Sequence, residues 1–143
     1  MKRNTLLSFI MLFVSLFAAS EAYSQEIYSE AKNLLAIIGE DGTIRDSHKR
    51  VLGSIDKDGT IYDGYHQKMG RFDGEFLIRD TNERTIGRID QDGTIRNGNN
   101  VVVGSVNKKG KVFGAMKYVV GYAAGVDKRI IAVFFFTDFF KHR

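Results

Sequence analysis

The 143-residue chain contains no cysteine. This absence excludes disulfides, thiolate metal sites and a lipoprotein anchor of the bacterial type, which is attached to a cysteine. Proline and tryptophan are also absent. The fold therefore rests on its hydrophobic core, which is feasible for a domain of about 119 residues.

The chain also lacks an apolar run long enough to cross a bilayer. The longest near the start, residues 6–17, is interrupted by Ser8 and Ser15 and falls short of the roughly 20 residues that a spanning helix needs. A basic start and small residues around Ala22 and Ser24 surround it, which is typical of a secretory signal peptide. We expect residues 1–24 to be removed before Gln25, with cleavage after Ala22 as the alternative. The mature chain, without a membrane span, is then secreted or periplasmic.

The sequence also lacks a strong excess of charge of one sign and any known catalytic motif. The net charge is +4, of which residues 1–24 supply +1. Acidic and basic residues are interspersed, whereas nucleic-acid-binding proteins usually carry a basic stripe, so no nucleic-acid partner is predicted. His48, His66 and His142 are scattered, and no zinc-protease, serine-hydrolase or phosphate-loop pattern occurs. We predict no enzyme activity, no cofactor and no metal.

The chain does contain a glycine that recurs every 17 residues. The column comprises Gly53, Gly70, Gly87, Gly104 and Gly121. Such a period indicates a repeat architecture. We divide the mature chain into a lead-in (25–35), extended or helical, five units (36–120), and a degenerate sixth unit with an aromatic C-terminal segment (121–143).

Each unit is expected to be a β-hairpin. In residues 52–63, β-branched residues lie on both sides of Lys57-Asp58-Gly59, a pattern that suits a tight turn with the glycine at positive φ. Ile55 should then face Ile61 on the buried side. In the third unit Phe76 takes the place of the turn glycine and Gly74 precedes it, which predicts a shifted turn.

The recurring glycine predicts a position where no side chain fits, near a shared central axis. The apolar column just before it lies on the other hairpin face and should be buried as well. That column comprises Leu52, Met69, Ile86 and Val103.

The C-terminal segment is apolar without alternation. It contains residues 130–136 followed by Phe139 and Phe140. Its β-branched and aromatic content favours a buried strand; a short helix after Asp127 is the alternative, which periodicity does not decide. In either form we expect this segment to close or plug the ring.

The repeat units resemble a family of small secreted bacterial proteins described as five-fold β-flower proteins. The resemblance covers residues 36–140 and rests on "VLGSIDKDGTIYDG", "TIGRIDQDGTIRNG", "VVGSVNKKGKVFGA" and the Phe-rich end. It implies an all-β fold of hairpins arranged radially about a pseudo-five-fold axis. It implies no activity, and a fold by itself does not supply one.

Several acidic residues invite a functional interpretation. The Asp-x-Asp-Gly-Thr segments at 56–60 and 90–94 lack an EF-hand's other ligands, so we interpret them as turns. Aspartates or asparagine recur ten positions into each unit, and we also interpret them as turn-forming rather than as a cation-holding ring. They are Asp46, Asp63, Asp80 and Asn97, with Gly114 in the fifth unit.

An outward column of arginine and aromatic residues is the strongest candidate binding face. It comprises Arg45, Tyr62, Arg79, Arg96 and Phe113, with Arg71 and Arg88 on a neighbouring column. The alternative is a solvated face balanced by Asp56, Asp73 and Asp90.

Three functions follow in order of preference. The first is a non-catalytic module that binds a glycan or an envelope protein through this outward face. The second is a structural or assembly role in the cell envelope. The third is a glycan-acting hydrolase that uses Glu75 and Glu83 with nearby aspartates.

Overall fold

The fold is known from a computed structural model, which describes residues 25–141. The expected signal peptide and its cleavage site at residues 1–24, and also His142, lie outside the described residues.

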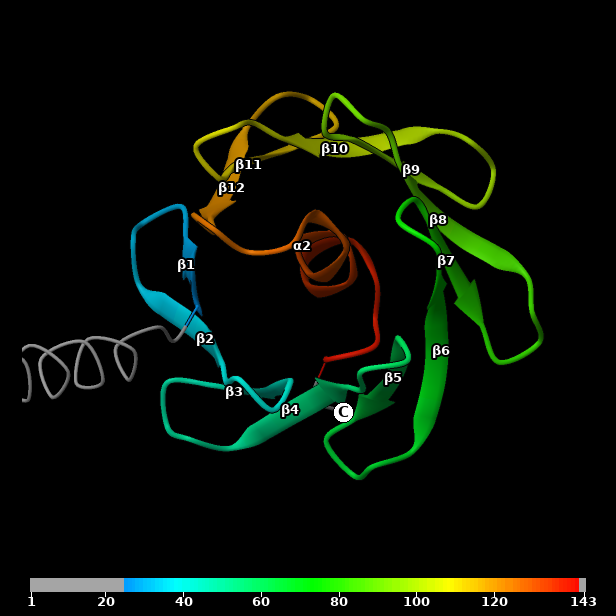
Figure 1. Ribbon diagram of the computed structural model, residues 1–143. Helices are drawn as coiled ribbons and strands as arrows, with labels where there is room; N and C mark the ends of the chain where they lie inside the picture. Colours follow the sequence, from blue (N-terminus) through cyan, green and yellow to red (C-terminus); the bar gives the residue numbers. More distant parts are fainter. Residues whose placement is uncertain (1–24, 142–143) are drawn as a thin grey trace, which may run out of the picture.

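Twelve antiparallel strands form a closed barrel in which each strand pairs with its neighbours in sequence and the last pairs with the first (Figure 1). The strands are β1 (Gln25–Ser29), β2 (Leu34–Ile38), β3 (Thr43–Arg45), β4 (Val51–Ile55), β5 (Thr60–Asp63), β6 (Lys68–Asp73), β7 (Leu77–Asp80), β8 (Thr85–Ile89), β9 (Thr94–Asn97), β10 (Val102–Val106), β11 (Lys111–Gly114) and β12 (Val119–Tyr122). The all-β class is therefore confirmed.

The predicted hairpin register is also confirmed. In β4 and β5, Ile55 pairs with Ile61 and Gly53 pairs with Asp63. The turn glycine Gly59 has φ 88°. In the third unit the left-handed residue is Gly74, with φ 66°, so the turn is shifted as expected.

Five strand pairs are hairpins closed by tight turns, and a sixth pair joins the two ends of the described chain. This pair is β12 with β1, in which Tyr28 lies opposite Tyr122 and Ser29 opposite Gly121. Residues 25–35 thus take the extended alternative, because β1 is a strand of the barrel. Ile27, 17 residues before Ile44, is completely buried.

The barrel interior contains one residue from each strand pair at the same repeat position. These residues are Ile27, Ile44, Ile61, Ile78, Ile95 and Val112, each at most 2% exposed. The helix α2 (Lys128–Phe136) lies inside the ring of strands (Figure 1). Its buried residues are Ile131, Ala132 and Val133.

The preference for a strand in the C-terminal segment was wrong, because residues 128–136 are helical. A helix satisfies its own backbone hydrogen bonds, whereas an added strand needs a free sheet edge, and the β1–β12 pairing leaves none in the barrel. Asp127 starts the helix, since its side chain accepts a hydrogen bond from the backbone N–H of Arg129 at 2.8 Å. The sequence signal was this N-cap residue.

The barrel has two different ends because consecutive connections alternate between them. We call the end with the hairpin turns, such as 56–59, the turn end. The opposite end, the connection end, has the loops 30–33, 46–50, 63–67, 80–84, 97–101 and 114–118. Each of these loops contains one residue with φ of 61–66°, again every 17 residues: Lys32, Lys49, His66, Glu83, Asn100 and Lys117.

Helix α2 begins at the turn end. There Lys128 Nζ donates to the Gln91 carbonyl oxygen and Arg129 Nη1 donates to that of Gly74. The Arg129 guanidinium also lies 4.8 Å from the centre of the Phe72 ring.

Candidate functional site: the outer face of the hairpins

The column of recurring glycines lies where the C-terminal segment meets the barrel wall. A Cβ atom added at Gly104 would overlap the Phe136 ring, and one added at Gly121 would overlap the Phe135 ring. Gly53 has the same relation to the Phe140 ring. At Gly70 the Phe139 ring is 3.1 Å from such a Cβ, and the atom that the Cβ would overlap is the Arg79 carbonyl oxygen. Gly87 differs, because its nearest neighbour is Ile78 Cδ1 at 3.1 Å. None of these five glycines has a positive φ. Glycine is therefore needed there because a side chain would not fit, and not because of the backbone conformation.

The phenylalanines of this segment pack inward. Phe140 is buried, and Phe134, Phe135, Phe136 and Phe139 are partly buried against the core. These residues therefore do not form an exposed aromatic tail, which is the arrangement that would favour an assembly role.

The outward column occupies equivalent places on successive hairpins. Tyr62 pairs across the hairpin with Ser54, and Phe113 pairs with Ser105. Tyr28 continues the column 17 residues before Arg45. The column thus extends around the barrel and includes the pair that closes it.

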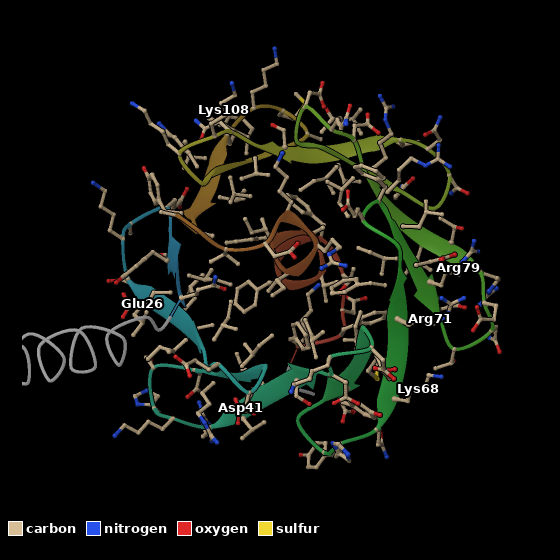
Figure 2. The ribbon with its side chains drawn as sticks, viewed as in Figure 1. Glu26, Asp41, Lys68, Arg71, Arg79 and Lys108 are labelled. Carbon is tan, nitrogen blue, oxygen red and sulfur yellow. The ribbon has the colours of Figure 1, made fainter. Side chains whose placement is uncertain are left out.

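Two adjacent hairpins present four arginines on this outer face. Arg71 lies directly opposite Arg79, and Arg88 lies directly opposite Arg96. Like charges in directly opposed positions destabilise a sheet. Four neighbouring strands carry the arginines, so the row is about 14 Å wide at the usual strand spacing. Figure 2 shows Arg71 and Arg79 on the side of the strands that faces away from α2.

Carboxylates offset part of this charge. Asp73 accepts from Arg79 Nε at 2.6 Å, and Glu83 accepts from Arg71 Nη2 at 2.6 Å. The hydrogen bond from Arg79 holds the pKa of Asp73 below its usual value, and the one from Arg71 does the same for the pKa of Glu83.

The two remaining arginines, Arg96 and Arg88, differ in whether they have an acidic partner. Asp90 lies 3.1 Å from Arg96 Nε. Arg88 is exposed and has no ion pair within the described part of the chain.

Aromatic rings lie on other parts of the outer face, two of them with a lysine ammonium beside the ring. The Lys111 ammonium lies 5.7 Å from the centre of the Phe113 ring, and that of Lys32 lies 5.6 Å from the centre of the Tyr122 ring. The Tyr62 ring stacks on His66 at 4.3 Å. The outer face therefore has an arginine sector on β6–β9 and an aromatic sector around β10–β12 and β1.

The recurring aspartates form turns, as predicted. Asp80 Oδ1 accepts from the backbone N–H groups of Asn82 and Arg84 at 2.9 and 3.0 Å, and the N–H of Arg84 holds the pKa of Asp80 below its usual value. Asp46, Asp63 and Asn97 bond in the same way. In the Asp-Gly-Thr segments, Asp58 and Asp92 accept from the N–H two residues on.

No cluster of three or more histidine, aspartate or glutamate side chains in residues 25–141 is placed to hold a metal ion. Glu83, one of the two proposed hydrolase carboxylates, is held as a carboxylate by Arg71. A glycosidase acid instead needs a raised pKa.

The predicted binding face is convex. A cleft of about 970 Å³ lies where β1 meets β12 and is lined by Tyr28, Ile38, Tyr122 and Ile130 among others. None of the five predicted binding residues lines this cleft or three other clefts in the described part of the chain. Tyr28 and Tyr122 are the outer-face residues that sequence reasoning missed, although the 17-residue spacing from Arg45 points to Tyr28.

A family model described as 5-fold beta-flower protein matches residues 24–141. Comparisons with curated proteins and with solved structures found no match. Within residues 25–141, no helix has the length and apolar character needed to span a membrane.

Proposed function

Because the chain belongs to the 5-fold beta-flower protein family, we propose for it a role that this family description leaves open, that of a non-catalytic binding module. Its ligand is an anionic glycan, which binds to the arginine sector of the outer face. We also propose that the mature protein is secreted or periplasmic, in keeping with the signal peptide expected at residues 1–24.

The observation that carries this proposal is the row of four arginines on a convex face. Enzymes and small-molecule receptors enclose their ligands in concave pockets. A row about 14 Å wide on four strands instead suits an extended polymer that lies across the hairpins. Guanidinium groups bind carboxylates and sulfates through paired hydrogen bonds, and these are the groups that anionic glycans carry.

Arg88 is the residue that we expect to make the first contact. It is exposed and lies opposite Arg96, and it forms no ion pair within the described residues. Arg71 and Arg79 share Asp73, so they can exchange one carboxylate partner for another supplied by the ligand.

We further infer the architecture that presents this face. The five turn-closed hairpins, the number that the family description implies, are arranged radially about a central axis, and the β12–β1 pair completes the circle as a sixth unit. The C-terminal segment acts as the plug of the ring. The contacts between its phenylalanines and the recurring glycines support this inference.

Isothermal titration of the mature chain with a polyuronate oligosaccharide tests the binding proposal. We expect binding that weakens with salt and an affinity loss of about 10-fold or more for Arg88→Ala, because a hydrogen bond to a charged group contributes about 1.5–3 kcal/mol.

Arg50→Ala is the matched control, since Arg50 is also an exposed arginine but lies in a connection loop next to Asp46. Equal binding of a neutral oligosaccharide, or equal losses in both variants, would overturn the proposal.

A further inference from the structure

Exposed large apolar side chains gather at one end of the barrel. Along the described chain seven such side chains are exposed, and six lie in or directly beside the loops of the connection end: Val51, Tyr65, Val101, Val102, Met116 and Tyr118. The exposed fractions of Tyr65, Met116 and Tyr118 are 86%, 75% and 69%. The seventh, Phe76, lies at the turn end. Large exposed apolar groups on one surface mark an interaction site.

The part of the sequence that supplies most of them has no acidic residue. Residues 93–126 contain no aspartate or glutamate, whereas acidic residues outnumber basic ones in residues 25–92. Of the five cations in 93–126, Lys117 lies in a loop of the connection end, while Lys108 and Lys109 lie in a turn at the turn end. Lys117 stands between Met116 and Tyr118 in one loop, so a cation lies beside the two most exposed apolar side chains of this sector.

Elsewhere at the connection end, carboxylates are largely engaged within the protein. Asp46 pairs with Arg50, Asp80 with Arg84 and Glu83 with Arg71. In contrast, no ion pair forms within the described residues at Lys49, Lys68 or Lys117. Lys49 and Lys117 occupy the positions of positive φ in their loops.

We propose that the connection end docks on the surface of an anionic phospholipid membrane. Tyrosine, methionine and valine side chains enter the interfacial layer, where amphipathic tyrosine rings are favoured, and the neighbouring lysines lie among the anionic headgroups. The protein rests on the membrane through these loops and does not cross it.

The spacing of the apolar residues favours a membrane over a second copy of the chain. They come from two separate pairs of adjacent loops, 46–50 with 63–67 and 97–101 with 114–118. The loops 30–33 and 80–84, which contain Glu30 and Glu83, lie between these pairs in the strand order. A fluid surface can contact both pairs at once, whereas a stable dimer needs one contiguous complementary patch.

Co-sedimentation of the mature chain with vesicles tests this proposal. We expect binding to vesicles of phosphatidylglycerol and phosphatidylcholine, weaker binding at high salt, and little binding to phosphatidylcholine alone. The double variant Met116→Ser/Tyr118→Ser should reduce the bound fraction at least about fivefold, because each side chain loses its insertion into the interface.

The matched control is Phe76→Ser, which removes an exposed apolar side chain at the opposite end. It should bind as the unchanged chain does, and so should Arg88→Ala, which separates this proposal from glycan binding. Unchanged melting temperatures show that the variants fold. The proposal is overturned by absence of binding to anionic vesicles, by equal loss in Phe76→Ser, or by light scattering in which the double variant abolishes a dimer instead.

Discussion

At Gly104 the lack of a side chain is required by the neighbouring atoms. A Cβ there would overlap the Phe136 ring and the Phe113 carbonyl oxygen, while one at Gly87 would lie 3.1 Å from the flexible end of Ile78. We expect Gly104→Ala to lower the free energy of unfolding by about 1–3 kcal/mol, the usual cost of overpacking, and Gly87→Ala to lower it by clearly less. Urea unfolding of the two variants measures this difference, and equal losses would contradict the argument.

The contribution of Asp80 in its connection loop to the stability of the protein depends on pH. The pKa of Asp80 lies below the unfolded value of 3.8, chiefly because the N–H of Arg84 donates to it. Its contribution to stability is therefore present above that value and is lost as the pH falls through the lower folded pKa. Asparagine keeps the acceptor oxygen but does not titrate. Asn97 occupies the equivalent position naturally, and its side-chain oxygen accepts the same kind of hydrogen bond.

We accordingly expect the melting temperature of the unchanged chain to exceed that of Asp80→Asn at about pH 6, with the difference shrinking as the pH falls below 3.8. Asp80→Ala should melt below Asp80→Asn throughout this pH range, because it also loses the turn. A difference between the unchanged chain and Asp80→Asn that does not vary with pH would show that this carboxylate contributes nothing through its charge.

At the scale of elements, local residues determine the hairpins, which is why they could be predicted. A glycine with φ 88° after Lys57-Asp58, with isoleucines on both sides, specifies turn, register and buried face together. The arginine column followed from the same register, because alternate residues of a strand share a face.

The C-terminal helix and β1 were harder to predict because non-local contacts determine them. A run such as residues 130–136 is apolar enough for either a strand or a helix, and only the closure of the barrel removes the sheet edge that a strand would need. Similarly, residues 25–29 become a strand by pairing with β12, almost a hundred residues away. Tyr28 was missed at the candidate site because the five predicted units begin at residue 36, although it lies 17 residues before Arg45.

The start of α2 provides a test at this scale. Asp127 caps the helix by accepting from the N–H of Arg129, so Asp127→Ala should lower the free energy of unfolding by about 1 kcal/mol. Asp127→Asn, which keeps a capping oxygen, should lose less. Thermal unfolding followed by circular dichroism compares them, and indistinguishable variants would mean that packing alone holds the helix.

For the whole molecule, closure by the first strand is as important as any hairpin. Ile27 and Ile61 occupy equivalent positions and both are completely buried. Ile27→Ala should therefore cost about 2–5 kcal/mol, as should Ile61→Ala. Chemical denaturation measures both, and a nearly unchanged Ile27→Ala variant would mean that the barrel is stable without β1.

The same repetition that makes the barrel also places one outward residue on every hairpin, so the repeat is the source of the proposed binding face. Its sequence varies around the ring, with arginines on β6–β9 and aromatic rings near β1 and β12. This variation predicts that ligand contacts concentrate in one sector.

Amide chemical-shift mapping of the mature chain during titration with a polyuronate oligosaccharide tests whether the ligand binds to the arginine sector. We expect the shift changes to cluster on the outer residues of β6–β9, around Arg71, Arg79, Arg88 and Arg96. Shift changes confined to the cleft between β1 and β12, or none at saturating oligosaccharide, would contradict this expectation.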